Sequence, residues 1–146
     1  MNDAIVRLRE ETGAGVMDCK RALDDAQGDL DKARTLIFER GAAKAEKKAE
    51  RKTGSGLLET YVHNNRVGVL LELRCETDFV ARTDAFKTLA HDIVMQIASM
   101  NPQSVDELLT QEFIKDSAIT INELVTRAIA SIGENIKIER FCRYEL

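Results

Sequence analysis

The feature that most constrains this chain is an abrupt change of hydrophobic period between residues 67 and 97. Apolar side chains first recur at every second position, which predicts a half-buried strand: Val67, Val69, Leu71, Leu73 and Cys75. They then recur at spacings of three and four, which predicts an amphipathic helix: Phe86, Leu89, Ala90, Ile93, Val94 and Ile97. The chain must therefore turn sharply within residues 75–82.

This corner places Asp78 beside Phe79. A large ring next to a carboxylate at an exposed corner is unfavourable unless the ring has a pocket to enter. Two interpretations follow: the ring folds back under its own helix, or it enters a pocket on another molecule. The pattern alone favours the first, because large apolar side chains are more often buried.

Length and composition limit the fold class. A chain of 146 residues buries one modest core, or one small core and a satellite module. With 44% hydrophobic and 32% charged residues it is typical of a globular protein, neither disordered nor membrane-spanning. A formal net charge of -4 argues against a general nucleic-acid binder, which needs a basic face.

The cysteines and the N-terminus predict a cytoplasmic location. Three cysteines lie far apart and are odd in number, which favours free thiols in a reducing compartment: Cys19, Cys75 and Cys142. The first residues, Met1 to Glu11, are charged and amphipathic and carry no apolar signal-peptide region. We therefore expect neither an exported nor a membrane protein.

Residues 1–41 predict a module of three short helices. The first begins at Asn2 or Asp3, and Asp29 caps the third. Glycines separate or end the helices: Gly13, Gly15, Gly28 and Gly41. The core of such a module is small, so we expect marginal stability.

The run Thr12-Gly13-Ala14-Gly15 is not a phosphate-binding loop, because it follows a helix and lacks the Lys-Ser/Thr ending. It predicts a tight turn that exposes Val16 and Met17 at a helix start, where a flexible thioether suits a partner. The alternative is that Met17 fills the small core. Lys20 and Arg21 follow one turn later on a solvated face.

Residues 42–53 are strong helix formers with a basic excess and no apolar stripe. This pattern predicts a solvated helical linker with nothing to bury. The basic excess also suggests RNA contact, but no aromatic residue is interleaved to stack on bases. The spacer is the favoured interpretation.

Residues 54–146 predict a small α+β core. Strands over 57–62 and 67–75 form a hairpin, and a long helix spans 84–100. Two capping boxes open further helices, Ser104 with Glu107 and Thr120 with Glu123. We expect the last helix to bury Leu124, Ala128 and Ile132, and the tail to form a third antiparallel strand with one alternating set: Ile136, Ile138, Cys142 and Tyr144.

We expect no covalent catalysis, no cofactor and no metal site. His63 falls in the hairpin turn and His91 on the exposed side of the long helix, without a nucleophile or carboxylate at a telling spacing. The sequence has neither a Cys-x-x-Cys nor a His-x-x-x-His pair.

Three strings resemble a known family. Thr77-Asp78-Phe79-Val80-Ala81-Arg82 resembles a signature of bacterial elongation factor Ts (EF-Ts), the nucleotide exchange factor of the GTPase EF-Tu. The string from Thr12 to Leu23 resembles the other signature of that family, and Ile132 to Leu146 resembles its closing string. The resemblance runs over nearly the whole chain.

The resemblance implies a domain organisation in three parts. Residues 1–41 would be a ubiquitin-associated-like helical module, 42–53 the linker, and 54–146 the EF-Ts core. The partner would be EF-Tu, both GDP-bound and nucleotide-free, with no membrane and no direct nucleic-acid binding. Phe79 would insert near the Mg²⁺ site of EF-Tu and Asp78 would fix the insertion. The implied partner-binding residues are Thr77, Asp78, Phe79, Val80 and Arg82 at the corner, and Val16, Met17, Lys20 and Arg21 in the N-terminal module.

This chain also departs from the family. Long members carry two related cores and a protruding coiled coil, whereas this chain has room for one core. Because short members use a homodimer to supply the second core, the resemblance implies a possible homodimer here, with the closing strand as the contact. Two other functions stay open: a helical adaptor that uses only residues 1–41, and an RNA-contacting accessory protein that uses 42–53.

Overall fold

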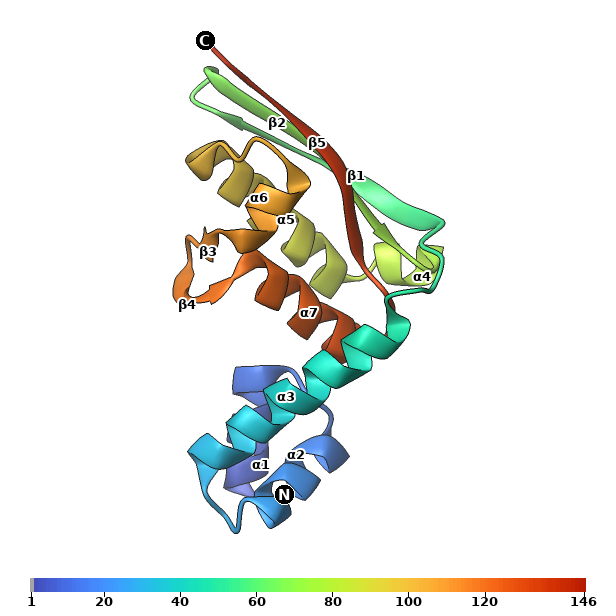
Figure 1. The fold of residues 1–146 in the computed structure, drawn as a ribbon, viewed down its shortest axis with the longest axis vertical. Coiled ribbons are helices and arrows are strands. Elements are labelled where there is room, and N and C mark those ends of the chain that lie inside the picture. The colour runs from blue at the N-terminus through green and yellow to red at the C-terminus, as the bar shows by residue number, and fades with distance from the viewer. Residues whose placement is uncertain (1) are drawn as a thin grey trace.

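A computed structural model describes residues 2–146. A helical bundle forms one end of the molecule, and a three-stranded sheet with helices on one face forms the other (Figure 1). The long helix α3 runs from the bundle towards the sheet. The predicted fold class, α+β with N-terminal helices and a small three-stranded antiparallel sheet, is confirmed.

The N-terminal bundle contains α1 (Asp3–Thr12), α2 (Val16–Asp25) and the first part of α3 (Leu30–Lys48). The predicted caps are confirmed: Asn2 Oδ1 accepts from the backbone N–H of Ala4 at 2.9 Å, and Asp29 Oδ1 accepts from those of Asp31 and Lys32. The small core has eight buried members: Ile5, Leu8, Cys19, Ala22, Leu23, Ala26, Ala33 and Ile37.

Helix α3 does not end at Gly41, where the sequence predicted a stop. It continues to Lys48, and Ala45 is buried in the main core, so the prediction that this segment has nothing to bury was wrong. Gly41 lies against helix α7 (Ile121–Ile132), because a Cβ at this position would sit 3.1 Å from the Cβ of Ala130. Close helix packing, and not helix termination, therefore explains this glycine. The domain division at 41 and 53 stays a prediction.

The three-stranded sheet has the order β1-β2-β5 and is antiparallel throughout. Its strands are β1 (Ser55–His63), β2 (Val67–Cys75) and β5 (Lys137–Glu145). The hairpin between β1 and β2 turns at Asn64 and Asn65, both with positive φ, as asparagine tolerates. The predicted hairpin and closing strand are thus confirmed, and β2 is the central strand.

The predicted side-chain alternation of the closing strand fails at Glu139. Glu72 pairs with Arg140 but the next residue, Leu73, pairs with Ile138, so β5 bulges by one residue there. Ile138 faces the core, whereas Cys142 and Tyr144 beyond the bulge are exposed on the opposite face of the sheet. A single extra residue moves every later side chain to the opposite face of the sheet, because the period of a strand is two.

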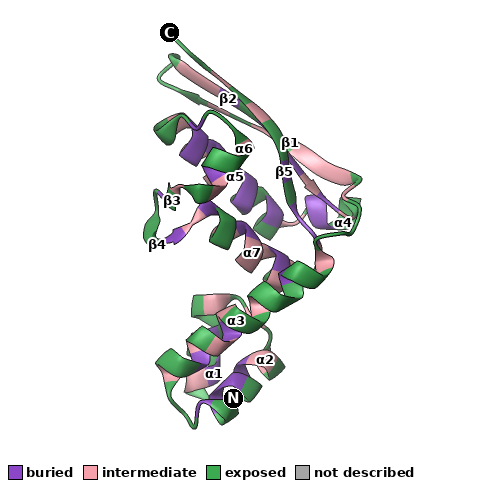
Figure 2. Cartoon of the chain, viewed as in Figure 1, coloured by how far each residue is buried: buried purple, intermediate pink, exposed green. Residues whose placement is uncertain are grey.

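The inner face of the sheet is covered by α4 (Asp78–Ala81), α5 (Asp84–Met100) and α6 (Val105–Thr110), whereas α7 (Ile121–Ile132) packs against α3, α5 and α6. Buried residues follow α5 along its length (Figure 2). Ser104 and Thr120 cap their helices as predicted, since Ser104 Oγ accepts from Glu107 N and Thr120 Oγ1 from Glu123 N, but Glu107 returns its bond to Gln103 N and not to Ser104 N, so this capping box is incomplete. A short ribbon of β3 (Glu112–Phe113) and β4 (Asp116–Thr120) was not predicted.

The buried stripe of α7 differs from the predicted one. Its buried residues are Ile121, Val125 and Ile129, whereas Leu124, Ala128 and Ile132 are only partly buried. Both α3 and α5 contact α7. Two contact faces broaden the apolar stripe, so its centre cannot be read from the spacing alone.

A substitution at position 56 tests how closely β1 approaches β2. Gly56 has a φ of 152°, and a Cβ there would lie 2.2 Å from the backbone oxygen of Leu73. We expect Gly56→Ala to lower the free energy of unfolding by roughly 1–3 kcal/mol or more, because backbone atoms must move. Gly54→Ala is the matched control, since nothing lies within 4 Å of its Cβ position. Equal urea midpoints for the two variants would contradict the close approach of β1 to β2 at this position.

Candidate functional site

The corner between β2 and α5 separates neighbouring side chains onto opposite sides. Thr77 caps α4, and its Oγ1 accepts from the backbone N–H of Val80 at 3.3 Å. Val80 and Ala81 are buried in the main core. Phe79 is 80% exposed, so it does not fold back under its own helix, the interpretation that the pattern alone favoured.

The predicted corner residues therefore differ in accessibility. Asp78, Phe79 and Arg82 are exposed and available to a partner, and Thr77 is exposed but also serves as the cap. Val80 faces inward and anchors α4 to the main core. The short helix presents a carboxylate and an aromatic ring next to each other while its inner side holds it in place.

The predicted N-terminal residues gather on the first turns of α2. Met17 is 56% exposed, and Lys20 and Arg21 are exposed one turn later. At spacings of three and four these three side chains share one face of the helix. Val16 is partly buried and packs against the small core, so it supports this face from beneath. Met17 is therefore not a core residue.

The two exposed sets flank the same end of α3. Lys44, near the end of α3, donates to Asp18 at 3.0 Å and so holds the start of α2. Just beyond α3, Arg51 lies 3.6 Å from the carboxylate of Glu76 at the corner. The corner helix α4 and the end of α3 lie at the same end of the sheet (Figure 1).

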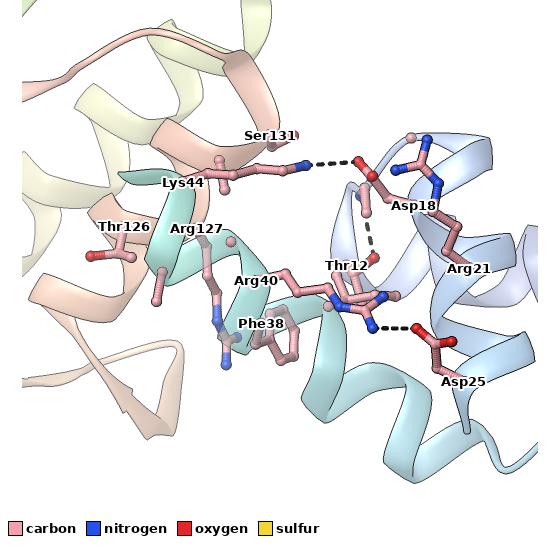
Figure 3. A pocket seen from close by; sticks show the side chains of 16 residues that line it. Thr12, Asp18, Arg21, Asp25, Phe38, Arg40, Lys44, Thr126, Arg127 and Ser131 are labelled. Carbon is pink, nitrogen blue, oxygen red and sulfur yellow. Dashed lines mark hydrogen bonds and ion pairs between the residues drawn. The ribbon is translucent and has the colours of Figure 1, made fainter. Parts of the chain in front are cut away.

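A cleft of about 580 Å³ lies between α2, α3 and α7, separate from the corner. Figure 3 shows two ion pairs crossing it, Lys44 with Asp18 and Arg40 with Asp25. On the α7 side, the Arg127 guanidinium lies 3.7 Å from the centre of the Phe38 ring. The ion pairs join α2 to α3, the contact of Arg127 with Phe38 joins α3 to α7, and neither Phe79 nor Met17 lines the cleft.

The chain matches known proteins along almost its entire length. A family described as Elongation factor TS matches residues 76–146. Elongation factor Ts of Carboxydothermus hydrogenoformans is 42% identical over 188 residues, covering 97% of this chain and 87% of the relative. The chain belongs to the elongation factor Ts family. Elongation factor Ts of Thermotoga neapolitana is 40% identical, covering 99% of this chain and 95% of that relative.

EF-Ts membership places the chain among the translation elongation factors. Both alignments span 188 residues, whereas this chain has 146, so the relatives carry internal residues that have no counterpart here. The range that matches the family begins at Glu76 and therefore includes residues 76–82 of the corner.

Sequence reasoning missed the residues that hold the corner from behind. Glu134 and Asn135 lie in the turn between α7 and β5, 57 to 59 positions away in sequence, yet they hydrogen-bond Glu76 and Thr77. The only signal was two polar residues directly after Gly133, the left-handed C-cap of α7. Such a pattern predicts a turn and does not name its long-range partners.

Within the described residues, little points to a metal site, a membrane-spanning helix or a catalytic histidine. No group of three metal-ligating side chains gathers within residues 2–146. The same residues include no helix with the length and apolar character needed to cross a membrane. His63 is exposed and accepts or donates one 2.8 Å hydrogen bond with the Tyr61 hydroxyl.

The cysteines give a direct check of burial. Cys19 and Cys75 are fully buried, and burial raises the pKa of both thiols, so the reactive thiolate is disfavoured. Cys142 is exposed. At high dilution we expect a maleimide dye to label one thiol rapidly and the other two only after denaturation. Rapid labelling that persists in Cys142→Ser would contradict this assignment.

Proposed function

We propose that this protein is a guanine nucleotide exchange factor that binds EF-Tu and promotes the release of GDP. The observation that carries the proposal is the exposure of Phe79, at 80%, on a helix whose other side is buried. EF-Ts family membership supplies the class of partner. The proposed place of action is the cytoplasm, and the proposed activity needs no cofactor and no covalent step.

The energetics favour a partner pocket for the ring. Burying a phenylalanine side chain is worth about 1.5–3 kcal/mol, which the free protein forgoes at this position. A ring that enters a fitted pocket often contributes more than most of its neighbours in an interface. Asp78, exposed beside it, offers a carboxylate that can accept hydrogen bonds from the partner.

The mechanism follows from how GTPases hold nucleotides. Backbone N–H groups, a lysine and Mg²⁺ grip the phosphates. We infer that insertion of Phe79 near this site, oriented by Asp78, disturbs the metal and the phosphate loop. Because linkage is reciprocal, the factor and GDP lower each other's affinity for EF-Tu by the same ratio. A high concentration of GTP then displaces the factor.

The N-terminal set supplies a second proposed contact. Met17, Lys20 and Arg21 share an exposed face of α2 and combine an adaptable apolar side chain with two cations. The adaptor alternative would use this face alone and leaves Phe79 unexplained. The RNA alternative has less support, because Lys44 is paired with Asp18 and Ala45 is buried.

We also propose that two copies associate through the outer face of the sheet. Exposed apolar side chains gather there around the hairpin end: Val62, Leu70, Tyr144 and, beside them, Cys142. At the other end of the same face, Arg74 and Arg140 donate to Glu72 and hold the pKa of that carboxyl below its ordinary value. A two-fold partner would cover the apolar end and leave the charged end near the corner free.

Release of fluorescent GDP from EF-Tu tests the exchange function. We expect the parent protein to accelerate release strongly and Phe79→Ala to lose most of the effect, by roughly 30-fold or more, with an unchanged thermal midpoint. Asp78→Asn should lose less. Met100→Ala is the matched control, because Met100 is also half-exposed and apolar but lies at the far end of α5. Normal exchange by Phe79→Ala would refute the proposed insertion.

Sedimentation across a concentration series tests self-association. We expect a monomer–dimer equilibrium that Tyr144→Glu shifts to monomer, because a carboxylate would be buried in the shared face. Lys87→Glu, an exposed charge reversal on α5, should leave it unchanged. A parent protein that stays monomeric at every concentration would contradict the proposed dimer.

A further inference from the structure

The corner is held by a carboxylate from a distant turn. Glu134 Oε1 accepts from the backbone N–H groups of Glu76 and Thr77 at 3.1 and 3.0 Å, and its Oε2 accepts from the Thr77 hydroxyl at 2.8 Å. One side chain thus binds three donors within two consecutive residues. Hydrogen bonds to an ionised acceptor are stronger than those between neutral groups.

The contact is reciprocal. Glu76 Oε1 accepts from the backbone N–H of Asn135 at 2.8 Å, so each of two glutamates caps the backbone of the other's segment. The Asn135 side chain donates to the backbone oxygens of Ala49 and Arg51, at 3.3 and 2.9 Å, just after α3. The corner, the α7–β5 turn and the end of α3 are therefore one hydrogen-bonded unit.

Glu134 also contacts the cap of α4. The Thr77 hydroxyl has one hydrogen to donate and two lone pairs to accept with. Its hydrogen goes to Glu134, and one lone pair accepts from the backbone N–H of Val80. Glu134 therefore contacts the same hydroxyl that caps the four-residue helix carrying Asp78 and Phe79.

We propose that Glu134 is a positioning residue for nucleotide exchange: it fixes the backbone of Glu76 and Thr77 so that Phe79 is presented ready for insertion. This inference rests on the proposed exchange function. Glu134 is only partly buried, and water could satisfy the same backbone N–H groups, so packing alone does not demand a glutamate there. The three directed hydrogen bonds instead restrict the conformations that the corner can adopt.

The expected effect is on apparent affinity. A corner that is correctly arranged for only a fraction of the time binds with an affinity lowered by that fraction. Glu134→Ala should therefore raise the factor concentration needed for half-maximal GDP release by roughly tenfold and leave the maximal rate at saturation unchanged. Glu134→Gln keeps one carbonyl acceptor, so its half-maximal concentration should lie much closer to that of the parent than to that of Glu134→Ala.

The experiment compares the parent, Glu134→Ala, Glu134→Gln, Phe79→Ala and the double variant Phe79→Ala/Glu134→Ala in fluorescent GDP release from EF-Tu. If Glu134 acts through Phe79, Glu134→Ala should add little to Phe79→Ala, since coupled residues are not additive. Glu123→Ala, an exposed glutamate at the start of α7, is the matched control. In the free proteins, amide hydrogen exchange of residues 76–82 should be faster than in the parent when Glu134→Ala is present, and not in Phe79→Ala or Glu123→Ala alone.

The outcomes distinguish the positioning role from the exchange function. Loss with Phe79→Ala but parental half-maximal concentration with Glu134→Ala would overturn the positioning role and leave the exchange function standing. Full additivity in the double variant, or a lowered maximal rate together with a lowered thermal midpoint, would show that Glu134 acts on general stability and also overturn it. Parental exchange by Phe79→Ala, or no exchange by the parent, would overturn both.

Discussion

The packing of β2 against α5 governs the rest of the structure. β2 is hydrogen-bonded on both edges, and Val69, Leu71, Leu73 and Cys75 are buried on its inner face. The first turns of α5 bury Phe86, Leu89 and Ala90. Both elements are fixed at their ends, so the residues between them have little freedom. Burial of Val80 and Ala81 then leaves the adjacent Phe79 on the outside.

Helix α3 connects the two proposed contact surfaces, the exposed face of α2 and the corner. Helix α3 packs against α7 at Gly41 and Ala130, and Ala45 enters the main core. The bundle is thus held to the main core by a continuous helix, by the contact of Arg127 with Phe38 and by the hydrogen bond that Ser131 Oγ donates to the backbone oxygen of Gly13. A rigid connection holds the exposed face of α2 at a set distance from the corner, which suits recognition of one partner at two places.

Local signals made much of the fold predictable from the sequence. The period-two run of β2, the helical spacing of α5 and the cap of α3 depend on residues close in the chain, and all three appear as expected. The bulge at Glu139 and the passage of α3 through Gly41 depend on partners far away, so their local patterns were misleading.

In the candidate site, too, some features could be predicted from neighbouring residues and others depend on distant contacts. The sequence located the corner by its change of period, but whether Phe79 points in or out depends on which neighbours are buried, and that is a tertiary property. Glu134 was missed because a glutamate after a glycine cap is ordinary at a turn. Its significance lies in the 57-residue separation from Thr77 that the fold closes.

The central claim is that the exposed Phe79 ring enters a pocket on EF-Tu. Fluorine NMR of the protein with 4-fluorophenylalanine at position 79 tests it most directly, with a second sample labelled at the buried Phe86 as reference. On addition of nucleotide-free EF-Tu, we predict that the signal at position 79 shifts and loses access to a soluble paramagnetic quencher, whereas the signal at position 86 keeps its chemical shift. A complex that forms while position 79 keeps its free shift and full quenching would contradict the account.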